Sequence, residues 1–319
     1  MSQYVTSRKC AIRSALLQQT PHTAFRLVPT DLRRPPGEFM DIGVLGPLFI
    51  SAHEPAEYIE LAPKPRTVLA VLVANAGATI PVSSLVREVW GDAPPASALR
   101  NLQTYVLQSR KMLSHLTGLP LRVVAGELLM TRPGGYTFSD TAAHFDYRSY
   151  LELTERGRRS LRNGAVRDGI ELYARALGLW RGPAFVDAVT GPALEAQRRQ
   201  LEESRLSVVE ALSDARINVG HYHEAISDLA ASVSEHPLHE GLHFQYMRVL
   251  DITGSRARAL EVFNRLRLNL VSELGIEPGA PVQQLQHHIL NAGDYVDHPD
   301  HPAYTAPYPP STGRMTPVV

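Results

Sequence analysis

A polar arc on one predicted helix carries side chains that are suited to contact nucleic-acid bases. Residues 97–116 (SALRNLQTYVLQSRKMLSHL) contain no Asp or Glu. With about 100° of rotation per residue, one arc of this helix gathers five polar side chains: Arg100, Asn101, Thr104, Gln108 and Lys111. Arg and Lys suit guanine O6 and N7, Asn and Gln suit adenine N6 and N7, and Thr suits a thymine methyl group. Phosphates would repel a carboxylate on this arc, so the missing acid has a physical reason if the partner is DNA.

The other side of the same helix is apolar. It carries Leu99, Leu102, Val106, Leu113 and Leu116, with Ser109 among them. This pattern is typical of an amphipathic helix whose apolar stripe packs against a core. Taken alone, a short acid-free arc is more often only a solvated helix face, and the neighbouring elements have to decide between the two interpretations.

Further side chains are predicted to contact the DNA backbone. They are basic or aromatic residues before, within and after the helix: Lys64, Arg66, Tyr105, Arg110, Arg122 and Arg132. Each phosphate that one of the basic residues among them neutralises adds about −0.9 to the slope of log K against log salt. The whole chain has 32 basic and 32 acidic side chains, but a local basic face matters more for a polyanion than the net charge.

The elements around the polar arc have the order of a winged helix-turn-helix. Two strand-like segments, 40–50 and 56–62, precede a predicted helix with four apolar residues on one face: Val68, Leu69, Leu72 and Val73. A short helix at 82–91 and a turn lead into the helix at 97–116. A hairpin follows, and its tip is formed by Pro133, Gly134 and Gly135. In this layout the third helix enters the major groove, and the hairpin tip is expected to reach the flanking backbone or the minor groove.

The C-terminal half shows only helical patterns, with an internal repeat. Gly220 and Gly254 are 34 residues apart, as are Ala225 and Ala259, and Gly164 begins a more diverged copy. A period of 34 residues is typical of tetratricopeptide helix pairs. The segment GPAFVDAVTGP is interpreted as a loop that lengthens one of the repeats.

The predicted fold is mainly α with an α+β N-terminal domain. Residues 1–39 are expected to be a disordered tail or an extension, and a translation start at Met40 stays open. Residues 40–140 are assigned to a winged-helix DNA-binding domain and 141–293 to an all-α tetratricopeptide-like domain. The Pro-rich residues 294–319 are expected to be disordered.

No enzymatic site, cofactor or metal is predicted. Cys10 is the only cysteine, so neither an internal disulfide nor a Cys-based zinc site is possible. His236, His239 and His243 have a spacing that one helix face could present to a metal, but we interpret them as surface or packing residues. The lack of an apolar run long enough to span a bilayer favours a cytoplasmic, nucleoid-associated protein.

Several motifs in a fixed order give the chain a family resemblance. They are MDIGVLGPL, LVREVWGDAPP, LQTYVLQSRKML and TRPGGY in the first domain, and AFVDAVTGP, HPLHEGLHFQYMRVL and LNLVSELGIEPGAPVQQLQHHIL in the second. Over residues 40–293 the chain resembles the Streptomyces antibiotic regulatory protein family, which joins an OmpR-like winged helix to a bacterial transcriptional activator domain. The family commonly has a basic residue in place of Gln108 and a Leu in place of Ser109.

The resemblance implies a transcriptional activator of a secondary-metabolite gene cluster. Such proteins bind direct repeats of double-stranded DNA near a promoter as side-by-side protomers, and recruit RNA polymerase holoenzyme. We therefore expect a homodimer on DNA. Two alternatives stay open: a peptide-binding scaffold built on the helical repeat, and a sensor gated by a small ligand.

Overall fold

The computed structural model describes residues 40–52, 57–58 and 60–291 of the 319-residue chain. The two predicted tails, residues 1–39 and 294–319, lie outside the described residues.

The described residues form two compact units. The first unit contains the residues up to Leu153 together with Arg175–Glu202. The second contains Thr154–Ala174 together with the residues from Glu203 onward. The first unit therefore takes in residues beyond the 40–140 range assigned to the winged helix.

The N-terminal sheet of the first unit has four short strands in the order β3-β2-β1-β7. They are β1 (Asp41–Gly43), β2 (Phe49–Ser51), β3 (Glu57–Tyr58) and β7 (His144–Phe145). Strands β1 and β2 are antiparallel, with Ile42 opposite Ile50, and β7 runs parallel to β1. The strand-like segment 40–50 is thus a hairpin, because Gly46 with a φ of 145° and Pro47 interrupt it.

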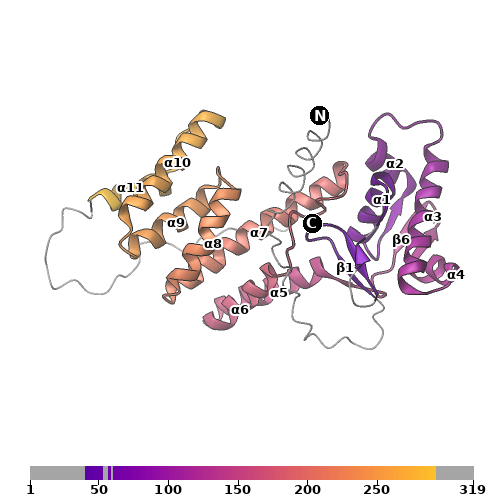
Figure 1. Ribbon diagram of the computed structural model, residues 1–319, viewed down its shortest axis with the longest axis horizontal. Helices are drawn as coiled ribbons and strands as arrows, with labels where there is room; N and C mark the ends of the chain where they lie inside the picture. The colour runs from indigo at the N-terminus through magenta and orange to yellow at the C-terminus, as the bar shows by residue number, and fades with distance from the viewer. Residues whose placement is uncertain (1–39, 53–56, 59, 292–319) are drawn as a thin grey trace, which may run out of the picture. The chain divides into compact units, whose positions relative to one another are not determined.

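The winged helix-turn-helix follows in the predicted order (Figure 1). Its three helices are α1 (Pro63–Ala74), α2 (Val82–Trp90) and α3 (Ala98–Thr117). A short helix α4 (Leu121–Val123) and a π-helical turn η1 (Val124–Leu128) lead into a three-stranded sheet. This sheet has the order β4-β6-β5 and consists of β4 (Thr79–Pro81), β5 (Leu129–Arg132) and β6 (Gly135–Phe138).

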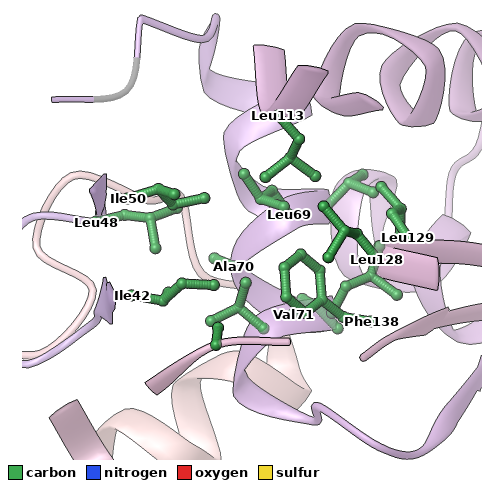
Figure 2. Close-up of a cluster of buried hydrophobic side chains, with 14 of the residues drawn as sticks. Ile42, Leu48, Ile50, Leu69, Ala70, Val71, Leu113, Leu128, Leu129 and Phe138 are labelled. Atoms are coloured by element: carbon green, nitrogen blue, oxygen red, sulfur yellow. The ribbon is translucent and has the colours of Figure 1, made fainter. Parts of the chain in front are cut away.

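Helix α1 lies at the centre of the first core. The sequence predicted one buried face, but every residue from Val68 to Val73 is at most 3% exposed. Figure 2 shows the reason, because the β1–β2 hairpin covers one side of Leu69, Ala70 and Val71 with Ile42, Leu48 and Ile50. On the other side lie side chains of α3, η1 and the hairpin: Leu113, Leu128, Leu129 and Phe138.

A loop from the predicted helical domain completes the first unit. We call residues 181–191 the strap. The amide of Arg181 donates to the carbonyl of Leu45 (2.8 Å), and the amide of Phe185 donates to the carbonyl of Val44 (3.0 Å). Phe185 is 1% exposed and has a φ of 55°, a conformation that costs about 1–2 kcal/mol in a non-glycine residue. The sequence predicted this loop but not its packing against the β1–β2 turn.

The carboxylate of Asp146 joins the strap to the β1–β2 turn. It accepts hydrogen bonds from the amides of Val44 (2.9 Å) and Leu45 (3.1 Å) and from Nη2 of Arg181 (3.0 Å). Burial raises the pKa of Asp146 above its ordinary value, and these three donors oppose the shift. Because three donors share one buried acceptor, losing the carboxylate would leave all of them unsatisfied.

The second unit is built from paired helices. The helices that contribute to it are α5 (Asp146–Arg162), α6 (Val166–Leu177), α7 (Pro192–Asn218), α8 (Tyr222–Glu235), α9 (Glu240–Ile252), α10 (Arg256–Leu274) and α11 (Ala280–Asn291). Helix α9 packs against α8, α10 and α11 (Figure 1). Among the described residues, none of the helices is long and apolar enough to cross a membrane.

The structure confirms the tetratricopeptide-like repeat. Gly164, Gly220 and Gly254 have positive φ values of 79°, 83° and 77°, and α6, α8 and α10 each begin two residues after one of them. Ala225 and Ala259 are both 0% exposed, so their small side chains let the paired helices approach closely. The interval between Gly164 and Gly220 is longer because it contains the strap and the 27-residue helix α7.

The histidines near the start of α9 serve capping and packing. The Nδ1 atom of His239 accepts a hydrogen bond from the amide of Leu242 (3.4 Å). His243 is 1% exposed, and its Nδ1 donates to the carbonyl of His239 (3.0 Å), which fixes its tautomer because a carbonyl only accepts. Burial lowers the pKa of His243 below its ordinary value. Within the described ranges no group of three potential metal ligands occurs.

Replacing His243 by Phe is expected to flatten the pH dependence of stability. As the pH falls below about 6.5, the unfolded chain binds a proton at this position before the folded chain does. Acid therefore destabilises the native protein through His243, and Phe removes this contribution. We expect a smaller fall in melting temperature between about pH 7.5 and about pH 5.5. His223→Phe, at an exposed position of α8, should keep the full fall, and equal falls in both variants would contradict the assignment.

Candidate nucleic-acid interface

Helix α3 forms because one face is apolar except at Ser109 and its C-terminal end is marked by a glycine. Leu102, Val106 and Leu113 are at most 1% exposed. Ser109 lies among them at 0% exposure, and its hydroxyl donates to the carbonyl of Tyr105 (3.0 Å). Burying this hydroxyl is therefore compatible with the core, because it is hydrogen-bonded. Gly118 then ends the helix with a φ of 68°.

The polar arc of α3 lies on the surface of the first unit. Arg100, Thr104, Gln108 and Lys111 are exposed, and Asn101 is half-buried. In the part of the chain that the structure describes, none of these five side chains forms an ion pair with a carboxylate. The arc is thus available to a large anionic partner.

Two side chains of the arc are held by local hydrogen bonds. The hydroxyl of Thr104 donates to the carbonyl of Arg100 (3.0 Å). The amide nitrogen of Asn101 donates to Oγ of Ser97 (3.1 Å), at the start of the helix. A bidentate contact from Asn101 to adenine would have to replace this bond, whereas Arg100, Gln108 and Lys111 have no such commitment among the described residues.

The sequence predicted Leu99 to be part of the buried stripe, and this prediction is wrong. Leu99 is 60% exposed. It lies in the first turn of α3, and residues 91–97 before it are exposed throughout. Its neighbour Ala98 is buried, so the first turn packs inward on the side of Ala98 and leaves Leu99 at the surface.

Three side chains from three helices stack beside the arc. The rings of Trp90 and Tyr105 are stacked with centroids 5.9 Å apart, and Nζ of Lys64 lies 5.3 Å from the Trp90 centroid. This stack brings the start of α1 and the end of α2 onto α3. Lys64 and Tyr105 were predicted as backbone contacts, but Trp90 was missed. An aromatic residue ending the short helix at 82–91 was the only available signal.

Arg110 connects α3 to the hairpin. Its Nε donates to the carbonyl of Leu129 (2.9 Å), and its Nη2 donates to Oγ1 of Thr131 (2.8 Å). Partial burial lowers the pKa of Arg110 from its ordinary value, and the electrostatic interaction with Tyr136 opposes this shift. Since two of its nitrogens are used within the first unit, we leave Arg110 out of the proposed phosphate contacts.

Replacing Arg110 by Ala is expected to destabilise the first unit by about 1–3 kcal/mol, because two charge-assisted hydrogen bonds are lost. Both tryptophans of the chain, Trp90 and Trp180, belong to this unit, so their fluorescence during urea unfolding reports the change. The salt dependence of DNA binding should stay as in the wild type. A slope reduced by about 0.9 would show that Arg110 contacts a phosphate after all.

Arg66 is also engaged within the first unit. Its Nη1 donates to the carbonyl of Asp187 in the strap (3.2 Å) and lies 3.4 Å from Oδ2 of the same residue. The Arg66 side chain is only 22% exposed. The sequence shows a basic residue at the start of a helix, but no local pattern connects it to its acidic partner Asp187, which lies far along the chain. We leave Arg66 out of the proposed phosphate contacts as well.

The hairpin forms the wing. Arg132 pairs with Gly135, so Pro133 and Gly134 form a two-residue turn. Gly134 has a φ of 78°, which suits Gly after Pro in a type II turn. A Cβ atom on Gly135 would lie 2.2 Å from the carbonyl oxygen of Ile80, so only Gly fits there. Arg132 at the wing and Arg122 in α4 are both exposed.

Glu88 anchors α2 to the start of α7. Its carboxylate accepts hydrogen bonds from the amides of Ala193 and Leu194, both at 2.9 Å. Such amides have no partner within their own helix, and a negative charge stabilises a helix N-terminus. A Cβ atom on Gly191 would lie 2.4 Å from the carbonyl oxygen of Glu88. The helix that precedes α3 is therefore held by residues that follow the strap.

Comparison with known families places both halves of the chain. Residues 56–138 match the family described as transcriptional regulatory protein, C terminal, and residues 145–290 match the bacterial transcriptional activator domain. A winged helix-turn-helix joined to this second domain defines a transcriptional regulator. The chain belongs to the Streptomyces antibiotic regulatory protein family.

Individual relatives agree with this assignment. The chain is 39% identical to the regulatory protein DnrI of Streptomyces peucetius over 81% of this chain and 94% of that protein. It is 34% identical to the transcriptional regulator RedD of Streptomyces coelicolor over 80% of this chain and 71% of that protein. The solved structure of Mycobacterium tuberculosis EmbR in complex with a low affinity phosphopeptide is similar, with a TM-score of 0.68 and 29% identity, over 80% of this chain and 66% of that one.

Proposed function

We propose that the protein is a sequence-specific DNA-binding activator of a secondary-metabolite (antibiotic) biosynthetic gene cluster. Two protomers bind direct repeats near a promoter, each with α3 in the major groove, and recruit RNA polymerase holoenzyme. It acts at the nucleoid in the cytoplasm, and without a cofactor. The winged helix corresponds to residues 40–140 and the activator domain to residues 141–293.

The exposed acid-free arc of α3 is the observation that carries this proposal. Its residues Arg100, Thr104, Gln108 and Lys111 face solvent within a winged helix, where this helix is the one that enters the major groove. Lys64, Tyr105, Arg122 and Arg132 remain the proposed backbone contacts, with the wing tip beside them. The three basic side chains among these contacts would each neutralise one phosphate, which gives a salt slope of about −3.

Footprinting with the full chain on the DNA upstream of the biosynthetic genes tests the proposal. We expect protected segments that recur on one face of the duplex, as side-by-side protomers on direct repeats require. Run-off transcription on the same DNA with RNA polymerase holoenzyme should rise when the protein is added.

Two results would overturn parts of the proposal. Uniform protection without a repeat would remove the direct-repeat arrangement, and an unchanged run-off yield would remove polymerase recruitment. Lack of specific binding to any promoter DNA would contradict the proposed function and favour the peptide-binding scaffold or the ligand-gated sensor.

A further inference from the structure

An exposed leucine borders the polar arc of α3. Leu107 is 42% exposed. It lies one helical turn after Gln103 and Thr104 and one turn before Lys111, and all three of these neighbours are exposed. In the described chain Leu107 is not among the side chains that pack against either hydrophobic core. An apolar side chain therefore lies at the edge of the arc that is proposed to face bases, next to Arg100 and Lys111 on the helix surface.

Thr104 adds a second apolar group to the same place. Its hydroxyl already donates its one hydrogen to the carbonyl of Arg100 (3.0 Å), so it has no hydrogen left to donate to a base, and its methyl is available for an apolar contact. Residues three apart on a helix are neighbours, and the Thr104 methyl and the Leu107 side chain thus form a small apolar strip. Arg100 and Lys111 lie at its two ends along the helix.

The major groove displays one apolar group, the C5-methyl of thymine. An apolar strip that enters the groove gains free energy where it covers this methyl and gains little elsewhere. We propose that Leu107, with the methyl of Thr104, is a specificity-determining contact that selects thymine through its C5-methyl group. The inference rests on the proposed function, since it requires α3 to lie in the major groove.

Replacing thymine by uracil tests this contact, because uracil pairs in the same way and lacks only the methyl group. A binding site is first selected from random duplexes with the full chain, and each thymidine is then replaced singly by deoxyuridine. For the wild type we expect binding to weaken about three- to fivefold at one or two positions, as the loss of one buried methyl implies. Leu107→Ala should bind more weakly and should lose the difference between thymine and uracil at those positions.

Leu99→Ala is the matched control, because Leu99 is the same residue type in the same helix and is 60% exposed. This variant should keep the difference between thymine and uracil. The inference is overturned if Leu107→Ala keeps that difference, or if the wild type binds every uracil-substituted duplex as well as the parent. If the selection recovers no sequence at all, the proposed function itself fails, and this inference fails with it.

Discussion

Replacing Arg100 and Lys111 together by Ala is expected to abolish sequence-specific DNA binding while the protein stays folded. Both side chains are exposed on α3 and neither has an ion-pair partner among the described residues, so the folded state loses no ion pair. A well-formed contact to a base edge is worth about 1–3 kcal/mol. Two such contacts amount to roughly 4 kcal/mol, or about a thousandfold in affinity.

Titration of labelled promoter DNA at several salt concentrations measures this effect. Arg122→Ala provides a comparison for the backbone, because losing a phosphate contact weakens binding to all sequences and reduces the salt slope by about 0.9. Arg267→Ala serves as the control, since Arg267 lies on α10 of the second unit, where it is paired with Glu277. Unchanged affinity in the Arg100 and Lys111 double variant would exclude α3 as the base-reading helix.

Asp146→Ala is expected to destabilise the first unit more than any other single substitution described above. The carboxylate is 11% exposed and pairs with Arg181 at 3.0 Å. Removing one partner of a buried ion pair costs about 3–5 kcal/mol, because the remaining charge is left uncompensated. Two backbone amides also lose their acceptor. In a unit of this size we expect a melting temperature lower by roughly 10 °C.

Tryptophan fluorescence during thermal unfolding measures this change, because both indole rings belong to the first unit. Trp180 should respond most strongly to unfolding of this unit, since its ring packs edge-on against the ring of Tyr150, with the ring centroids 5.4 Å apart. Asp92→Ala, in the exposed turn before α3, should melt like the wild type. Equal melting temperatures for the Asp146 and Asp92 variants would show that the strap contributes little to the stability of this unit.

The winged helix-turn-helix and the helical repeat could be predicted because their signals are local. The apolar period and the missing acid of α3 lie within one helix, and the repeat appears as equal spacings between Gly220 and Gly254 and between Ala225 and Ala259. Such patterns show which face of an element is buried. They do not show what covers it, which is why the exposure of Leu99 was not foreseen.

Several contacts that the sequence did not reveal join residues about one hundred positions apart. Asp146 and Val44 are separated by 102 positions, and Glu88 and Ala193 by 105. No periodicity connects such residues, so a buried carboxylate that binds backbone amides looks like any other acidic residue. The same reason explains Arg66, whose partner Asp187 lies 121 positions away.

The strap has a consequence for how regulators of this family can be recombined. A crossover between residues 138 and 145, where the two family matches meet, would separate the β1–β2 turn from the Asp146 and Arg181 that hold it. A hybrid protein made at that junction would combine a turn from one parent with a strap from another, and an ill-matched pair would weaken its DNA-reading half. Functional hybrids should therefore be those in which residues 146 and 181–194 are inherited from the same parent as that half.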